Sequence, residues 1–592
     1  MKDKSSVQQT KKEKRGLSVD PTPTGISRRK FLTFLGTGSA ALAAGSSGIL
    51  SGEAKAQGTT GGATASGGQG ASGSGAKVFF KPIKPTDKDD VVLPEGFGYK
   101  VIRAWGDPVT SDRNFGFNND YVAYFPIDAL AGGDDSEDGI LWVNHEYVDS
   151  KWVSGFKGEG DLSADQIEKE KAAVGGSVIR VRKEGDSWQF VEDGEYNRRI
   201  DAKTPMDLTG PAAGSEAVQG ANEVVGTLAN CSGGVTPWNT VLSCEENFQY
   251  YYGARTPKNA EDDEASADAG WLNAKETQPP EHYGWVVEID PFDKQSKPRK
   301  HTWLGRIRHE NVALRVADSG KVVAYTGHDQ EDECIYKFVS SGAYKEGDRK
   351  ANLDLLTDGM LYVADFANGK WTALDFENNP IFKDNDFKDQ ADVLTRTAEA
   401  VKLSETEDDP PIGTPMDRCE DIEVHPETGT VYCSLTNNEN HGNFHGQVLR
   451  IFEKDGDPEA TEFSFEVFAA GGPNTGFSSP DNLAFDNSGN LWVVTDISSS
   501  KHNQGIYTTF KNNGIFVMPA VEEQARGDAF QFASGPVESE MTGPFFTPDG
   551  KTLFLAVQHP GEESESVDEP TSTWPGGDKP KPAVIAITGG FA

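Results

Sequence analysis

The sequence predicts an all-β fold, a six-bladed β-propeller with long irregular insertions, and three observations support this prediction. Short runs of Val, Leu, Phe, Tyr and Trp recur along the chain, bounded by Gly, Asn and Asp, with almost no helical periodicity outside 162–173 and 391–402. Six of these runs share one form, in which an apolar strand ends in polar residues. Most of the six follow a partner strand and a tight turn that contains glycine.

The composition is that of a large, acidic, globular protein. The 592 residues include 93 Asp and Glu against 56 Lys and Arg, for a formal net charge of −37. This balance argues against nucleic-acid binding, because phosphate contacts need a basic surface. Hydrophobic residues make up 36%, too few for a multispan membrane protein and too many for a disordered chain. The five cysteines do not make a disulfide framework in a chain this long.

Residues 1–56 have the features of a twin-arginine signal peptide. Arg28 and Arg29 precede a weakly apolar stretch rich in Gly and Ala, and residues 54–56 form a small-x-small cleavage pattern. A buried or transmembrane helix is the less favoured alternative, because glycines interrupt a run that is barely long enough to span a bilayer. We therefore expect export by the twin-arginine machinery, to the periplasm or the extracellular space.

Residues 57–76 form a predicted flexible linker, since they are nearly all Gly, Ser, Ala, Thr and Gln. The fold should begin near Val78, and residues 77–592 form the predicted catalytic propeller. Twin-arginine export moves folded proteins, often ones that have already acquired a metal or cofactor, so the signal favours a bound cofactor.

The six strands lie in order along the chain, at 140–146, 240–247, 322–329, 431–438, 491–496 and 553–559. Partner strands precede four of them, at 312–316, 422–425, 483–485 and 545–547, and each is followed by a turn that ends in Gly. Glycine suits these turns because it adopts positive φ without strain. The spacing between units is uneven, with long insertions at 147–225, 250–300 and 339–415. A β-sandwich or two smaller β domains therefore remain as alternatives.

Polar side chains at the strand ends should gather at one mouth of the propeller. In a hairpin, the start of the first strand and the end of the second lie at the same edge, and a ring of blades brings these edges together. The mouth should collect ten carboxylates: Glu146, Glu245, Glu246, Glu310, Asp329, Glu420, Asp421, Asp481, Asp496 and Glu540. So many like charges need cations, and oxygen ligands suit Ca²⁺, Mg²⁺, Mn²⁺ or Fe³⁺.

Two further residues have an open role on this evidence. Cys231 lies in a Gly-rich loop, where it is either a thiolate ligand of a transition metal or a small buried apolar residue. Arg418 stands two residues before Glu420, so it forms either a structural ion pair or a clamp for an anionic substrate. No GxSxG elbow, Walker loop or dinucleotide fingerprint is present, and a covalent serine mechanism has no support.

Several segments together resemble the PhoX-type alkaline phosphatases. They are 230–247 (NCSGGVTPWNTVLSCEEN), 306–310 (RIRHE), 327–329 with 336–339, 418–432 (RCEDIEVHPETGTVY), 479–485 (SPDNLAF) and 558–562 (QHPGE). The resemblance implies a six-bladed propeller with a mixed iron–calcium centre of two Fe³⁺ ions and several Ca²⁺ ions. It also implies an alkaline phosphatase that hydrolyses phosphate monoesters, and some diesters, for phosphate acquisition. Small organic phosphate esters are thus the expected substrates.

The resemblance also implies roles for individual residues. Cys231 matches the iron-binding cysteine, and Arg418 matches the arginine that holds the phosphate. Metal-cluster carboxylates are implied at Glu246, Glu310 and Glu420. Three more are expected beside them, Glu245, Asp481 and Glu540, and hairpin geometry alone supports Glu146, Asp329, Asp421 and Asp496. The implied nucleophile is a metal-bound oxide or hydroxide.

One position departs from the family pattern, because Cys419 stands where the family usually has Pro between the Arg and the Glu. Proline would fix φ, so its loss could loosen Arg418, and the thiol could become an extra metal ligand.

Two other functions remain as alternatives. A calcium-dependent lactonase on a similar propeller would need an axial Ca²⁺ and a histidine acid/base, and would leave Cys231 without a role. A non-catalytic exported binding protein would hold calcium only as a structural ion. In each case a monomer is expected, since a closed propeller leaves no free sheet edge that demands a partner.

Overall fold

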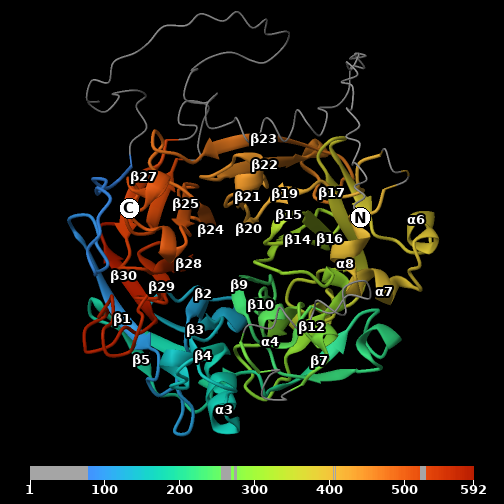
Figure 1. Ribbon diagram of the computed structural model, residues 1–592. Coiled ribbons are helices and arrows are strands. Elements are labelled where there is room, and N and C mark those ends of the chain that lie inside the picture. The colour runs from blue at the N-terminus through green and yellow to red at the C-terminus, as the bar shows by residue number, and fades with distance from the viewer. Residues whose placement is uncertain are drawn as a thin grey trace, which may run out of the picture.

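Six β-sheets of four to six strands surround a central axis in the computed structural model, and the predicted six-bladed β-propeller is confirmed (Figure 1). The structure describes residues 78–254, 269–271, 277–404, 406, 409–519 and 528–591. The predicted signal peptide and linker, residues 1–56 and 57–76, lie outside the described residues. Within the described ranges, no helix has the length and apolar character needed to cross a membrane.

The first three blades take up the chain from residue 119 to residue 373. Blade 1 contains β2 (Asn119–Pro126), β3 (Asp138–His145), β4 (Gly175–Glu184) and β5 (Ser187–Val191), with β6 (Arg198–Ile200) paired to β4. Blade 2 runs in the order β9 (Asn230–Val235), β10 (Val241–Glu245), β11 (Val286–Ile289), β12 (Arg299–His301), β7 (Pro205–Thr209) and β8 (Glu223–Val225). Blade 3 contains β13 (Ala313–Val316), β14 (Lys321–Gly327), β16 (Ile335–Ala343), β17 (Gly359–Asp365) and β18 (Lys370–Ala373).

The last three blades have four strands each. Blade 4 contains β20 (Cys419–Val424), β21 (Val431–Leu435), β22 (Gln447–Glu453) and β23 (Phe463–Ala470). Blade 5 contains β24 (Pro480–Phe485), β25 (Leu491–Thr495), β26 (Gly514–Met518) and β27 (Phe530–Ser534). Blade 6 contains β28 (Glu540–Phe546), β29 (Thr552–Gln558), β30 (Ala583–Gly589) and β1 (Phe97–Ala104). A separate pair joins β15 (Glu331–Glu333) to β19 (Met416–Asp417).

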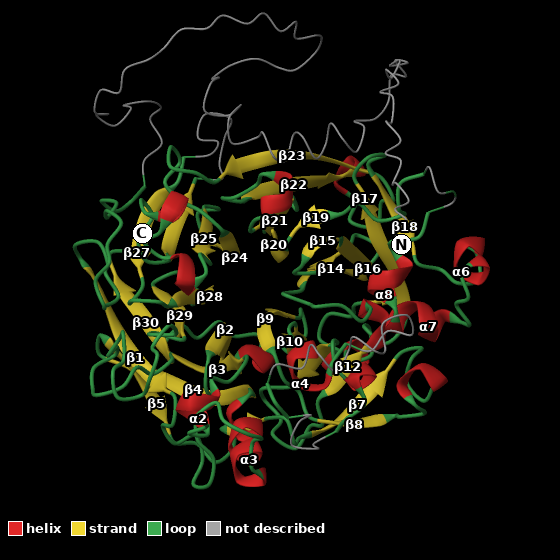
Figure 2. Cartoon of the chain, viewed as in Figure 1, coloured by secondary structure: helices red, strands yellow, loops and turns green. Residues whose placement is uncertain are grey.

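The helices are short and lie in the connections between strands (Figure 2). They are α2 (Ser150–Val153), α3 (Ala164–Ala173), α4 (Gln249–Tyr252), α5 (Arg349–Asn352), α6 (Pro380–Asp384), α7 (Gln390–Thr395) and α8 (Thr397–Ala400). The first predicted helix corresponds to α3, where Ser163 caps the N-terminus in a capping box with Gln166. The second predicted helix is divided into α7 and α8.

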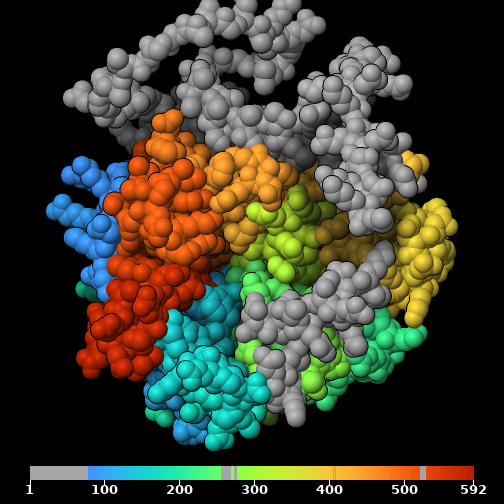
Figure 3. All heavy atoms as spheres, viewed as in Figure 1, coloured from blue at the N-terminus to red at the C-terminus, as the bar shows by residue number. Residues whose placement is uncertain are grey.

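The innermost strands form a closed ring around the axis. Contacts run from β2 to β9, β13, β20, β24, β28 and back to β2. The second strand of each blade is buried along nearly all of its length, and β21 and β25 are completely buried, because each blade packs between two neighbours. In the space-filling view, the blades appear as successive colour sectors that abut around this face of the molecule (Figure 3).

The ring is closed by the two ends of the propeller chain. β1, drawn blue, lies beside β30, drawn red, and the two strands pair antiparallel from Phe97 with Gly589 to Ala104 with Ala583 (Figure 1). The hairpin between β20 and β21 turns at Gly429, with φ of 68°, in agreement with the predicted glycine turns. Closure brings the polar strand ends of all six blades to one mouth.

Candidate metal centre

A cavity of about 150 Å³ at the mouth is lined almost entirely by polar side chains. Its lining includes nine of the eleven predicted metal-site residues and one further carboxylate that was not predicted. The eight carboxylates are Glu146, Glu246, Glu310, Asp329, Glu420, Asp481, Asp496 and Glu540, joined by the thiol of Cys231 and the unpredicted Asp120. Each carboxylate lies at or shortly before a strand start, or just after a strand end, so the hairpin edges converge at one mouth as predicted.

Cys231 stands at the centre of this lining. Its Sγ lies 3.1 Å from Oε1 of Glu310 and 3.4 Å from Oδ2 of Asp120. Three groups of residues each offer potential ligand atoms that lie within 4.8 Å of one another inside the group. Neighbouring groups share a residue, Cys231 or Glu310. The three groups are Asp120–Glu146–Cys231, Cys231–Glu246–Glu310 and Glu310–Asp329–Glu420. Such a chain of shared oxygen and sulfur atoms fits several adjacent cations.

The electrostatics of the carboxylates indicate that the cluster needs positive charge. Burial, followed by repulsion from neighbouring carboxylates, raises the pKa of Glu246 and of Glu310 well above the usual range. Burial likewise raises the pKa of Glu146 to about 7. It also raises the pKa of the Cys231 thiol well above the ordinary value of a cysteine. In the described part of the chain, Oε2 of Glu310 has no hydrogen-bond partner. Bound cations would supply this missing partner and favour the ionised forms, so the donor set fits metal ions.

Arg418 is the only Lys or Arg that lines the cavity within the described residues. Its Nε and Nη2 donate to the two carboxylate oxygens of Asp329 at 3.0 and 2.9 Å, and Nη2 lies 2.6 Å from Glu420. The backbone of Arg418 has a φ of 58°, and the side chain keeps 25% of its surface exposed. Against the effect of burial, the guanidinium lowers the pKa of Asp329. Arg418 is thus held in a fork by Asp329 and remains accessible at the mouth.

The structure does not bring Glu245 into the cluster. Its Oε1 pairs with Nζ of Lys300 at 2.6 Å, and both side chains are completely buried. Its Oε2 accepts hydrogen bonds from the backbone N–H groups of Gly284 and Trp285. Adjacent residues of a strand point to opposite sides, so when Glu246 faces the cavity Glu245 faces the interior of its blade.

Asp421 is also placed elsewhere, although its neighbour Glu420 lines the cavity. Its Oδ2 accepts from the backbone N–H of Leu483 at 3.0 Å, and its other oxygen accepts from Asn311. Asp421 therefore joins blades 3, 4 and 5 through hydrogen bonds. The same alternation along a strand separates it from Glu420.

Asp120 and Gln558 are members of the site that were not predicted from the sequence. Asp120 lies on β2 and is 2% exposed, and Gln558 at the end of β29 donates to Asp120 at 3.1 Å and to Glu146 at 2.5 Å. The signal for Asp120 is present in the sequence, because Asn118, Asn119 and Asp120 precede an apolar strand as polar motifs do in other blades.

Cys419 does not line the cavity. It is completely buried in an apolar cluster with Cys433 and Val323. The thiol therefore takes a packing position on β20, and Arg418 is held by Asp329 instead of by a following proline.

Comparisons with known proteins identify the family of the chain. The family model described as alkaline phosphatase PhoX matches residues 78–561. The solved structure of Pseudomonas fluorescens PhoX, in complex with vanadate as a transition state analogue, is 34% identical. That match covers 86% of this chain and 98% of the other, with a TM-score of 0.76. No curated protein matches.

Two gluconolactonases are similar only at a low level. The enzyme from Xanthomonas campestris is 10% identical with a TM-score of 0.27, over 86% of this chain and 98% of that one. The periplasmic enzyme from Pseudomonas aeruginosa is 10% identical with a TM-score of 0.28, over 68% and 80%. The family model and the PhoX structure both cover most of the chain, and on that ground the chain belongs to the alkaline phosphatase PhoX family.

Proposed function

We propose that this phosphatase is an exported alkaline phosphatase that hydrolyses small phosphate monoesters, and some diesters, at a mixed iron–calcium centre. The observation that carries the proposal is the cavity in which one thiol and nine carboxylates surround a single partly exposed arginine. Vanadate, bound in the similar P. fluorescens structure, mimics a phosphoryl group in transfer, which supports phosphate chemistry here.

The donor set supports two kinds of metal. One of the three groups of potential ligands combines a sulfur atom with oxygens from two glutamates, namely Cys231, Glu246 and Glu310. Because a thiolate favours a transition metal, this group suits iron. Carboxylates such as Asp481 and Glu540 are hard oxygen ligands that suit Ca²⁺. When bound, the metals would supply Lewis-acid chemistry, neutralising phosphate charge and activating water.

The protein's own residues then position the ester. Arg418 would hold a non-bridging phosphate oxygen, because its Nη1 lies 3.9 Å from the nearest carboxylate oxygen of Asp496 and is the less tightly paired end of the fork. Asp329 orients this guanidinium through its two hydrogen bonds. Hydrolysis breaks the ester P–O bond, and water supplies both the oxygen that joins the phosphorus and the proton that the alcohol takes.

The proposal extends to the location and the state of the protein. Residues 1–56 act as a twin-arginine signal and 57–76 as a linker, and the folded propeller, residues 77–592, is exported to the periplasm or beyond. A monomer is supported by the pairing of β1 with β30, which closes the ring within one chain.

The first test is elemental analysis and visible spectroscopy of the exported, folded protein, with assays on phosphate esters. We expect iron and calcium, a thiolate-to-iron charge-transfer band, and phosphate release. Cys231→Ala should lose the band and most of the iron, whereas Cys433→Ala, a buried cysteine in the apolar cluster, should keep both. Calcium alone on a colourless protein, or no phosphate release by the metal-loaded enzyme, would contradict the proposal.

A further inference from the structure

A second cavity, of about 320 Å³, lies directly beside the metal centre. The two cavities share Tyr147 and His559, which line both. Tyr147 follows Glu146 in the chain, and His559 follows Gln558, so one wall of the second cavity continues the wall of the first. The side chain of His559 lies 3.3 Å from Glu540 on the metal side and 3.6 Å from Glu562 on the other side.

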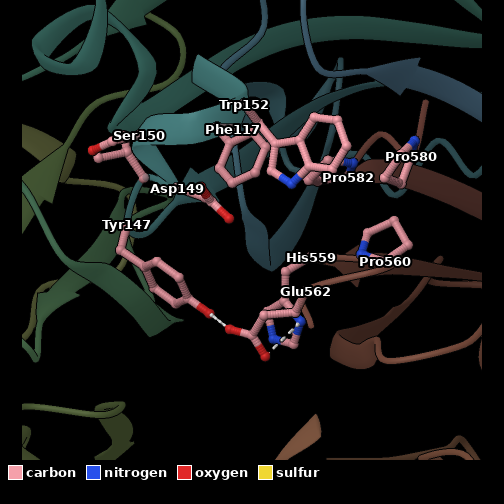
Figure 4. Close-up of a pocket in the computed structure, with 11 residues that line it drawn as sticks. Phe117, Tyr147, Asp149, Ser150, Trp152, His559, Pro560, Glu562, Pro580 and Pro582 are labelled. Carbon is pink, nitrogen blue, oxygen red and sulfur yellow. Dashed lines mark hydrogen bonds and ion pairs between the residues drawn. The ribbon is translucent and has the colours of Figure 1, made fainter. Parts of the chain in front are cut away.

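The walls of this second cavity combine rigid rings with several polar side chains. Two aromatic rings line the cavity, those of Phe117 and Trp152 (Figure 4). Three prolines complete this part of the wall, Pro560, Pro580 and Pro582. Aromatic and proline rings have few rotatable bonds, so they offer flat surfaces at little entropic cost. A volume of about 320 Å³ is in the range of small-molecule sites and can hold one aromatic ring with a short side arm.

The elements that carry these walls are fixed to one another. Trp152 lies on α2, and Asp149 caps this helix by accepting from the backbone N–H of Lys151. The hydroxyl of Tyr147 donates to Glu562 at 2.7 Å, a bond that Figure 4 shows as a dashed line. Nζ of Lys151 donates to the backbone oxygen of Glu562 at 3.2 Å. The segment after β3 and the segment after β29 therefore form one preformed pocket.

The described lining of the pocket is acidic, and two neighbouring lysines, Lys151 and Lys579, lie outside it. Its described lining contains the carboxylates of Asp149 and Glu562 and includes no Lys or Arg. Lys151 pairs with Asp149 at 2.8 Å and leaves Glu562 beside the imidazole of His559. A carboxylate or second phosphate on the bound group would meet this negative charge, whereas a neutral ring would not.

We propose that this pocket, here called the leaving-group pocket, binds the organic part of the phosphate ester while the phosphate lies in the metal centre. The inference rests on the proposed function and adds the class of ester: neutral alcohols that carry an aromatic or heteroaromatic ring. Trp152 and Phe117 supply the stacking surfaces and are specificity-determining residues. Hydrolysis then releases the ring-bearing alcohol into this pocket and phosphate at the metals.

The test compares benzyl phosphate with ethyl phosphate, whose alcohols have similar acidity and differ in the ring. Trp152→Ala should raise KM for benzyl phosphate about tenfold and leave KM for ethyl phosphate within about twofold. Trp152→Phe should restore most of the preference. Trp303→Ala is the matched control, since Trp303 is also half-buried in a one-turn helix but lies outside the pocket. An equal change for both esters, or none, would overturn the pocket.

Failure of the proposed function has a different signature. If the metal-loaded wild-type protein hydrolyses neither ester, the proposed phosphatase activity is contradicted. The pocket is then tested separately, by comparing the affinities of benzylphosphonate and ethylphosphonate in calorimetry. Tighter binding of the benzyl compound that Trp152→Ala abolishes would support the pocket. Equal binding of the two phosphonates would overturn it.

Discussion

Lys300 and Glu245 form an ion pair with no access to water, and this pair explains why a predicted metal ligand has a structural role. Nζ of Lys300 also donates to the backbone oxygen of His282, and Glu245 accepts from Thr227. Burial lowers the pKa of Lys300, while Glu245 favours its charged form. Each charge therefore depends on the other for its stability in the blade.

Lys300→Met should lower the free energy of unfolding by about 3–5 kcal/mol, because Glu245 would be left buried and uncompensated. Chemical denaturation would measure this change. The double variant Lys300→Met/Glu245→Gln should recover part of the loss, and the iron and calcium content of the folded fraction should stay the same. Loss of metal without loss of stability would instead make Glu245 a metal ligand.

Arg418 is the residue on which phosphate binding should depend most. Arg418→Ala should lower kcat/KM for p-nitrophenyl phosphate by about 100-fold, since a charge-assisted contact to the transferring group is lost. Arg418→Lys keeps the charge but cannot reproduce the forked contact with Asp329, so an intermediate value is expected. Metal analysis of both variants separates lost phosphate binding from lost metal.

Arg182→Ala serves as the control for this series, because Arg182 pairs with Asp138 on blade 1, outside the cavity, and is 43% exposed. Its kcat/KM should match the wild type. If Arg418→Ala changed only the melting temperature and left kcat/KM intact, the arginine would be a structural ion pair alone.

At the residue scale, the sequence predicted the site well where a single polar residue ends a strand. It misplaced one member of each acidic pair, Glu245 and Asp421, because the hairpin argument locates strand ends without resolving which side a side chain faces. Asp120 was missed since no glycine turn marks the hairpin of blade 1 as clearly as those of blades 3 to 6.

At the element scale, β1 is the strand that locks the propeller. Its partner β30 lies at the other end of the chain, so no local turn signal connects them, and the sequence predicted the closed ring without its closing pair. The second strands β3, β10, β14, β21, β25 and β29 agree with their predicted positions to within a few residues, because local hairpin patterns define them. The insertion at 147–225 was predicted as irregular, yet it supplies β7, which pairs parallel with β12.

Removal of β1 tests this lock. A protein that begins at residue 78 should fold and unfold cooperatively, whereas one that begins at residue 106 should aggregate, because the edge of β30 is exposed and its apolar partners are lost. Size-exclusion chromatography and thermal unfolding by circular dichroism would measure both. Equal melting temperatures for the two proteins would show that closure contributes nothing to stability.

At the scale of the whole molecule, the ring brings together charges that are far apart in the sequence. Gln558 and Asp120, which share a hydrogen bond, are 438 residues apart. Only closure of all six blades places them in one cavity, so the folded state concentrates carboxylates that the unfolded chain keeps apart and hydrated. The metal-free propeller therefore carries an electrostatic cost that grows as these groups ionise.

This cost predicts how the metal-free protein responds to pH. Burial raises the pKa of Glu146 from 4.5 to about 7. It also raises the pKa values of Glu246 and Glu310 well above the ordinary 4.5 of a glutamate. The folded state thus holds more protons than the unfolded state above pH 4.5, and stability must fall as pH rises toward 7 and beyond. Each such group lowers the free energy of unfolding by up to about 1.4 kcal/mol per pH unit.

Urea unfolding of chelator-treated protein from pH 5 to pH 8 would measure the slope. We expect a steep loss of stability that iron and calcium together abolish, because bound cations stabilise the ionised carboxylates. In metal-free Glu246→Gln the free energy of unfolding should depend less steeply on pH, since one titrating carboxyl group is lost. Glu184→Gln, which changes an exposed residue, should match the wild type. A metal-free protein whose stability is the same at pH 5 and pH 8 would mean that the cavity carboxylates are not strained by burial, and the argument that they require cations would fail.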